Sequence, residues 1–261
     1  MGELEIIFLG TGTSQGVPII GCDCITCKSS DPRDQRFRTS ILLRTNSVSL
    51  LIDTSPDFRT QCLRENIRKV DAVLYTHSHT DHVMGFDDLR RFCEMADSDL
   101  PIYAVSETLN DLKRIFPYAF QTTHSFLKNY MRAAPREIKG EFSLGDLRII
   151  PVALPHGRFT TTGFVFFRGA RKLLAYYTDC KSVPPEAQEA ARGAEILVLD
   201  ALRHVPHPTH LTLQEATEAA QRLSVRGCYF THMSHDLKHE ETESTLPLGI
   251  RLAYDGLQLR I

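Results

Sequence analysis

The chain has 261 residues, of which 42% are hydrophobic and 24% are charged, and its formal net charge is −2. This is the balance of an ordinary globular protein, and it excludes a disordered chain. The near-neutral charge also excludes a global field that would draw the protein to DNA or to an anionic membrane. We expect one domain over residues 1–261.

The N-terminus has Glu3 and Glu5 around a short apolar run and lacks the basic and long apolar segments of a secretory signal. No apolar stretch approaches the roughly 20 residues needed to cross a bilayer. We therefore expect a cytoplasmic protein with no membrane partner. Three of the seven cysteines cluster at Cys22, Cys24 and Cys27, which favours metal binding over disulfides.

The first half of the chain alternates strand and helix patterns. Residues rich in β-branched and aliphatic side chains predict strands over 4–9, 40–45, 48–52 and 72–75. Apolar residues three or four positions apart predict helices near 59–66, 87–95 and 108–116. Residues 117–136 show the least regular pattern, and a flap that covers a site is one role considered for this segment.

The second half resumes with a predicted hairpin of strands 141–144 and 147–152, followed by strands 163–168, 173–177 and 196–199. Thr212 and Glu215 match a capping box that starts a helix running to about residue 223. A strand over 228–230 leads into His232, and a last hairpin is expected around Asp255-Gly256. The pattern predicts two packed β-sheets with helices outside.

Four side chains that commonly bind metals directly follow the apolar strand 72–75: His77, His79, Asp81 and His82. Loops at strand ends are where functional sites are often built. In extended backbone the first three share one face, and a turn into a helix can carry Asp81 and His82 toward a second point. One short motif can therefore supply two cations at the spacing of a two-metal site.

This H-x-H-x-D-H run resembles the signature of the metallo-β-lactamase superfamily. The resemblance implies an α/β fold, the four-layer αββα sandwich, with further ligands at His156, Asp179 and His232, each where a predicted strand ends. It also implies how the ligands divide: His77, His79 and His156 for one cation, Asp81, His82 and His232 for the other, and Asp179 between both.

A mixed set of imidazole and carboxylate ligands suits two divalent transition metals, Mn or Zn first, with Fe or Ni open. A hydroxide that bridges the two metals is then the expected nucleophile. Asp53 matches a position that supports the ligands in the family, and a turn-capping role is the alternative. The oxygen-reducing branch of the family usually has Glu where this chain has His79, which favours hydrolysis.

The loop at about 21–38 predicts a second kind of metal site. Cys22, Cys24 and Cys27 supply three thiolates, and His235 can complete a tetrahedral structural zinc. With residues 10–16, 31–33 and 38–40, this loop resembles the phosphoribosyl cyclic phosphate phosphodiesterase family of phosphonate breakdown. The alternative is that the thiols pack as small hydrophobic groups.

The H-x-T run that begins at His210 resembles phosphodiesterases of this fold, including the ribonuclease Z family. The resemblance implies that His210 protonates the leaving oxygen, and we count Asp81 and His210 as the catalytic residues. Arg33, Arg36 and Arg38 form a basic cluster that either meets a phosphate or faces solvent.

The expected function is hydrolysis of a small cyclic phosphate or nucleotide phosphodiester by a two-metal, bridging-hydroxide mechanism. The alternatives are an RNA-processing nuclease of the ribonuclease Z type, a thioesterase or lactonase, and a non-catalytic metal-binding protein. A small substrate is favoured over a large nucleic acid, because the long basic arm of the ribonuclease Z family has no counterpart in the sequence. The sequence is also compatible with a homodimer.

Overall fold

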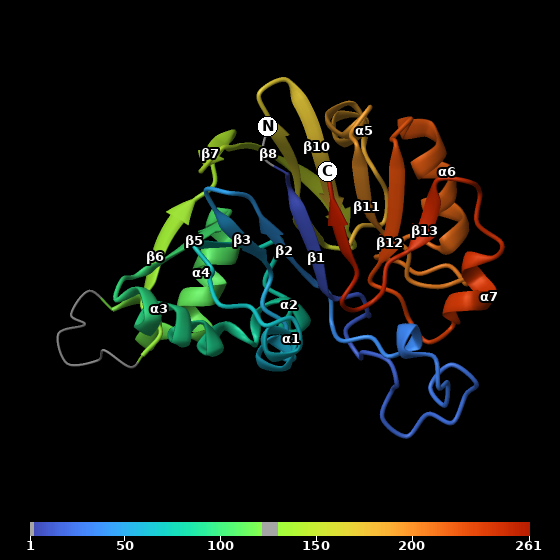
Figure 1. The fold of residues 1–261 in the computed structure, drawn as a ribbon, viewed down its shortest axis with the longest axis horizontal. Coiled ribbons are helices and arrows are strands. Elements are labelled where there is room, and N and C mark those ends of the chain that lie inside the picture. The colour runs from blue at the N-terminus through green and yellow to red at the C-terminus, as the bar shows by residue number, and fades with distance from the viewer. Residues whose placement is uncertain (1–2, 122–129) are drawn as a thin grey trace.

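The computed structural model describes residues 3–121 and 130–261, which fold into two β-sheets packed face to face (Figure 1). The strands of the first sheet are, in spatial order, β14 (Gln258–Arg260), β1 (Glu5–Gly10), β2 (Ser40–Arg44), β3 (Ser49–Ile52), β4 (Ala72–Leu74), β5 (Leu100–Ala104) and β6 (Ala133–Glu137). Those of the second are β13 (Ile250–Leu252), β12 (Gly227–Thr231), β11 (Ile196–Asp200), β10 (Arg171–Tyr177), β9 (Phe159–Arg168), β8 (Leu147–His156) and β7 (Phe142–Leu144).

Helices cover the outer face of each sheet, which confirms the expected αββα order (Figure 1). Between the strands of the first sheet come α1 (Phe58–Arg64), α2 (Thr80–Val83), α3 (Arg90–Ala96) and α4 (Ser106–Ile115). Between those of the second come α5 (Pro185–Ala191), α6 (Leu213–Leu223) and α7 (His239–Glu243). Short 3-10 turns are η1 (Pro32–Asp34), η2 (Phe86–Leu89) and η3 (Pro117–Phe120). In the described part of the chain no helix combines the length and the apolar character that a membrane span requires.

The two-residue period of a strand explains why both faces of β1 are apolar. Ile6 and Phe8 belong to the buried cluster between the two sheets, which also contains Phe166 of β9. Ile7 and Leu9 point the other way and belong to the cluster beneath the helices of the first sheet. The strand is therefore buried on both sides.

The parallel strands determine where a site can form. Strands β3 to β6 run parallel in the first sheet, and β10 to β13 run parallel in the second. Parallel strands that are neighbours in a sheet have their carboxyl ends at the same edge. Within each sheet, residues that follow neighbouring parallel strands, β3 and β4 in the first and β10, β11 and β12 in the second, are therefore close to one another although they are far apart in the sequence.

Several sequence predictions about elements need correction. The hairpin expected around Asp255-Gly256 is wrong, because β13 pairs with β12 whereas β14 pairs with β1 in the other sheet. Strands β5 and β6 were not predicted; each contains a proline, Pro101 and Pro135, which weakens a strand signal. Helices α5 and α7 were also not predicted, and the helix expected at 87–95 is divided into η2 and α3.

The segment proposed as a flap, 117–136, begins with η3 and ends in β6. Its middle, residues 122–129, lies outside the described residues.

Candidate metal centre

The structure brings all seven predicted ligands together, from strand ends far apart in the sequence. They divide into two groups: His77, His79, His156 and Asp179, and Asp81, His82, His232 and Asp179. Within each group, one potential ligand atom from every side chain lies within 4.8 Å of all the others. Asp179 belongs to both groups, as the resemblance implied.

Unpartnered nitrogen atoms show that this donor set fits cations. The Nε2 atoms of His77 and His82 are buried and have no hydrogen-bond partner among the described residues, although buried polar atoms normally have one. They lie 3.7 and 3.3 Å from Asp179 Oδ2. On the opposite side of each ring, Nδ1 is engaged: that of His77 lies 2.9 Å from Thr76 Oγ1, and that of His82 2.7 Å from Asp53 Oδ2. The rings are held with Nε2 directed at the cluster.

The electrostatics of most of the cluster favour the protonation states that bind metals. His82 is the exception: burial opposes a positive charge there, but the carboxylates of Asp179, Asp81 and Asp53 outweigh it and raise the pKa of His82 well above its usual range. Burial lowers the pKa of His77 well below its usual range, and burial also lowers the pKa values of His79 and His156. Neutral imidazole is the form that ligates metals. Burial opposes ionisation of Asp179, but His232 and His82 outweigh it and hold the pKa of that carboxyl well below its usual range.

Asp53 supports this cluster without joining either group. Its side chain is fully buried at the end of β3. Oδ1 accepts a hydrogen bond from the backbone N–H of Thr76, 2.9 Å away, and Oδ2 accepts one from Thr76 Oγ1, 2.8 Å away, besides contacting His82. Of the two roles open from the sequence, contact with a ligand is the one that the structure shows.

His210 lies beside both groups and is held by a residue that sequence reasoning missed. Its Nδ1 is 2.7 Å from Oδ2 of Asp200, which ends β11 and is fully buried. Burial opposes a positive charge on His210, but Asp200 outweighs it and raises the pKa of His210 to about 9. The available signal was an acidic residue at the end of an apolar strand, the same signal that marks Asp179.

A cavity of about 480 Å³ opens onto the cluster. Its walls include five of the seven predicted ligands and His210. Sequence reasoning did not identify the remaining wall residues: Ser14, Gly157, Arg158, Phe159, Pro208 and Thr209. These residues determine what can lie next to a group bound at the cluster.

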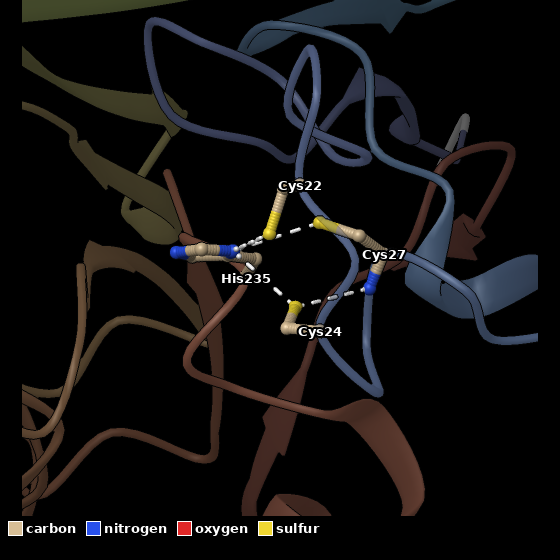
Figure 2. A group of neighbouring side chains, drawn as sticks. All are labelled: Cys22, Cys24, Cys27 and His235. Atoms are coloured by element: carbon tan, nitrogen blue, oxygen red, sulfur yellow. Dashed lines mark hydrogen bonds between the residues drawn. The ribbon is translucent and has the colours of Figure 1, made fainter.

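The predicted cysteine clamp also assembles (Figure 2). His235 Nδ1 lies 3.3, 3.4 and 3.5 Å from the Sγ atoms of Cys22, Cys24 and Cys27. The backbone N–H of Cys27 donates to Cys24 Sγ and lowers the pKa of that thiol to about 6, which favours the thiolate form that binds metal. Three sulfur atoms and one nitrogen converge on one point, which fits a tetrahedral zinc better than a hydrophobic cluster.

The arginines of the basic cluster are engaged within the protein. Arg33 pairs with Asp31 at 2.6 Å, and Arg38 pairs with Asp57 at 3.0 Å. Arg36 is buried and donates to the carbonyl oxygens of Ser234 and Leu237, 2.8 and 2.5 Å away. These two residues flank His235, so Arg36 holds the clamp histidine against the cysteine loop. Neither role considered from the sequence describes Arg36.

Known proteins resemble the chain over nearly its full length. The family model of the beta-lactamase superfamily domain matches residues 49–233. A diphosphatase from the PhnP family, solved as a crystal structure, is 43% identical, and the match covers 99% of this chain and 97% of that chain with a TM-score of 0.91. Ribonuclease Z from Methanopyrus kandleri is 25% identical over 99% of this chain and 98% of its own length.

One further relative differs in length. An octanoyltransferase from Porphyromonas gingivalis is 36% identical over 98% of this chain, but the match spans only 51% of that protein. The chain thus corresponds to about half of that relative.

Proposed function

This chain belongs to the beta-lactamase superfamily, and from its site we propose that it is a binuclear metal-dependent phosphodiesterase that hydrolyses a small cyclic phosphate or nucleotide phosphodiester. The observation that carries the proposal is that His210, held by Asp200, shares one cavity with both groups of candidate ligands. The similarity to a PhnP-family diphosphatase, which extends over nearly the full length of both chains, supports phosphate ester chemistry at the level of the family.

The donor set assigns a role to each candidate ligand. His77, His79 and His156 would hold one cation and Asp81, His82 and His232 the other, with Asp179 shared. Imidazole and carboxylate donors suit Mn or Zn, with Fe and Ni as further candidates. When bound in such a pair of sites, divalent cations lower the pKa of a water molecule and neutralise charge on a phosphoryl group.

His210 supplies what the ligands do not, a proton donor. Its ring lies 4.7 Å from those of both His156 and His232, measured between centroids. Because Asp200 occupies Nδ1, Nε2 is the atom left to hold a proton toward the cavity. An alkoxide is a poor leaving group unless it is protonated, so a donor at this wall suits cleavage of a phosphodiester.

The cavity supports a small substrate. Its volume of about 480 Å³ lies in the usual range for small-molecule sites, roughly 300–1,000 Å³. A ribonuclease of the ribonuclease Z type is the alternative, favoured by the similarity to the Methanopyrus kandleri enzyme. A cytoplasmic location is part of the proposal, supported by seven cysteines of which none forms a disulfide.

The proposal is tested with metal-loaded protein and a panel of substrates: a bis-aryl phosphate, a ribose cyclic phosphate, a short RNA and an octanoyl thioester. We expect hydrolysis of the two small diesters, little of the RNA and none of the thioester. Asp179→Asn should abolish this activity, while Asp71→Asn, at a carboxylate that accepts a hydrogen bond from Ser49 N–H away from the site, should retain it.

Other outcomes separate the alternatives. Cleavage of the RNA in preference to the small diesters would replace the proposal by a ribonuclease. Cleavage of the thioester alone would assign acyl chemistry, the activity named for the longer octanoyltransferase relative. Full metal occupancy with no hydrolysis of any substrate would identify a metal-binding protein without catalysis.

A further inference from the structure

The tip of the β8–β9 hairpin forms one wall of the cavity. His156 pairs with Phe159 across the tip, so Gly157 and Arg158 make a two-residue turn. Gly157 has a φ of 63°, and a Cβ atom there would lie 2.6 Å from Thr209 Cγ2. A glycine is therefore needed for the tip to pack against the loop that carries His210. This packing fixes the tip beside the metal centre.

Phe159 presents an aromatic ring to the cavity. The residue is 55% exposed, unusual for a large apolar group, and its ring lies 5.2 Å from that of His79 at an angle of 82°. One edge of the ring system therefore adjoins a candidate ligand while much of its surface faces water. An exposed aromatic ring beside a binding site can stack on a planar group of a ligand. A nucleic-acid base is such a group, and every base can stack because every base has a π-face.

Arg158 adds a cation next to this ring. It is exposed and lines the same cavity. Within residues 3–121 and 130–261 no carboxylate forms an ion pair with it, in contrast to the engaged arginines of the cysteine loop. A guanidinium with free donors is suited to an anion such as a phosphate.

We propose that Phe159 and Arg158 select substrates that carry a planar base, as a nucleotide does and a bare sugar phosphate does not, together with a second anionic group beyond the scissile phosphate. The inference rests on the proposed function, because that function places the reacting phosphate at the histidine–aspartate cluster. Phe159 would stack on the base next to that phosphate, and Arg158 would bind the additional anion at the mouth of the cavity.

The role of Phe159 is tested by calorimetric binding to metal-loaded protein, with AMP and ribose 5-phosphate as probes, of which only AMP carries a base. We expect AMP to bind about tenfold more tightly, because base stacking on an aromatic ring contributes at this scale. Phe159→Leu keeps an apolar side chain and should reduce the ratio to about two or less, with ribose 5-phosphate affinity unchanged. Leu248→Ala removes another exposed apolar side chain and should leave the ratio intact.

The role of Arg158 is tested with adenosine 3′,5′-bisphosphate against AMP. The second phosphate should tighten binding to the wild type several-fold, and Arg158→Gln should remove that gain. Arg226→Gln is the matched control, because Arg226 is also highly exposed but lies directly before β12, away from the carboxyl ends that form the site. Equal affinities of the wild type for AMP and ribose 5-phosphate, or ratios unaffected by either variant, would overturn the inference.

These outcomes are separable from the proposed function. Hydrolysis of small diesters without any preference for the base would refute the selection and leave the hydrolase intact. A base preference that depends on Phe159, in a protein that cleaves no diester, would refute the hydrolase and support the stacking role.

Discussion

Three residues of the site adopt left-handed backbone. Asp53, Asp179 and His232 have φ angles of 62°, 53° and 60°, in a region that costs a residue other than glycine about 1–3 kcal/mol. Asp53 and His232 directly follow β3 and β12, and Asp179 comes two residues after the end of β10. Such strain is retained where the surrounding structure requires it, and at all three positions the side chain contacts the cluster.

Replacement of Asp53 tests whether its contact with the candidate ligand His82 strengthens metal binding. Asp53→Ala removes the hydrogen bonds to His82 and Thr76, so His82 is no longer held with Nε2 toward the cluster. Loss of such a partner typically weakens metal affinity about 10- to 100-fold. Competition with a chromophoric chelator measures this affinity, with Asp71→Ala as the control. An affinity equal to that of the wild type would show that Asp53 only caps a turn.

Replacement of His210 tests the proton donor. His210→Asn should lower turnover of a diester with an alkoxide leaving group by about 10²- to 10⁴-fold. A nitrophenyl diester should be affected far less, because its leaving oxygen needs no proton. Metal content, measured by elemental analysis, should stay unchanged.

His207→Asn serves as the control, since His207 lies in the same loop and contacts Thr209 rather than Asp200. Equal losses on both kinds of diester would assign His210 to binding, and no loss on either would remove it from the mechanism.

At the scale of elements, the strand ends explain which parts of the site were predictable. A strand that ends in a residue able to bind metal is visible in the sequence, as at His77, Asp179 and His232. Asp200 ends β11 in the same way, but a single acidic residue there does not reveal its partner, His210. Phe159 and Arg158 could not be assigned, because their role depends on where the β8–β9 tip packs in three dimensions.

The same limit applies to the fold. The patterns located most strands within one or two residues, because local periodicity encodes burial on each face. Pairing partners are not local. Asp255-Gly256 signals a turn, yet the chain uses it to cross from β13 in one sheet to β14 in the other. A turn dipeptide specifies that the chain changes direction, but it does not specify which strand the following strand will pair with.

The cysteine clamp yields a prediction about one loop. Cys24→Ser removes one of four convergent donors, so the protein should lose about one zinc per chain. The loop at about 21–38 should then be cleaved faster in limited proteolysis. Apart from η1 this loop has no helix or strand, so we expect the clamp to be what holds it in place.

Active-site metal content should persist in this variant, and Cys62→Ser in α1 should change neither zinc content nor cleavage. An unaltered zinc content in Cys24→Ser would contradict the clamp.

At the scale of the whole molecule, a buried carboxylate joins segments from distant parts of the chain. Asp255, in the crossing between the sheets, accepts hydrogen bonds from Thr11 Oγ1 and from the backbone N–H of Phe37, both at 2.8 Å, and pairs with Arg64 at 3.1 Å. Burial raises the pKa of Asp255 to about 6, from 3.8. The folded state therefore binds a proton more tightly than the unfolded state does.

This shift predicts how stability depends on pH. Protonation of Asp255 favours folding, so its contribution is complete below about pH 4 and is lost as the pH rises through about 6. Relative to Asp255→Asn, which does not titrate, the wild type should gain about 2–3 kcal/mol of unfolding free energy between pH 7.5 and 4. Urea unfolding of both proteins measures the difference. A constant difference across this range would contradict the shifted pKa.

The most direct test of the account is the number and position of cations bound to the whole protein. Elemental analysis combined with anomalous X-ray scattering from crystals should find three per chain: one in the cysteine clamp and two at the histidine–aspartate cluster, roughly 3.5–4 Å apart with Asp179 between them. Asp179→Asn should lose cations from the cluster and keep the one in the clamp. A well-folded protein that retains the clamp metal but never more than a trace at the cluster would contradict the account.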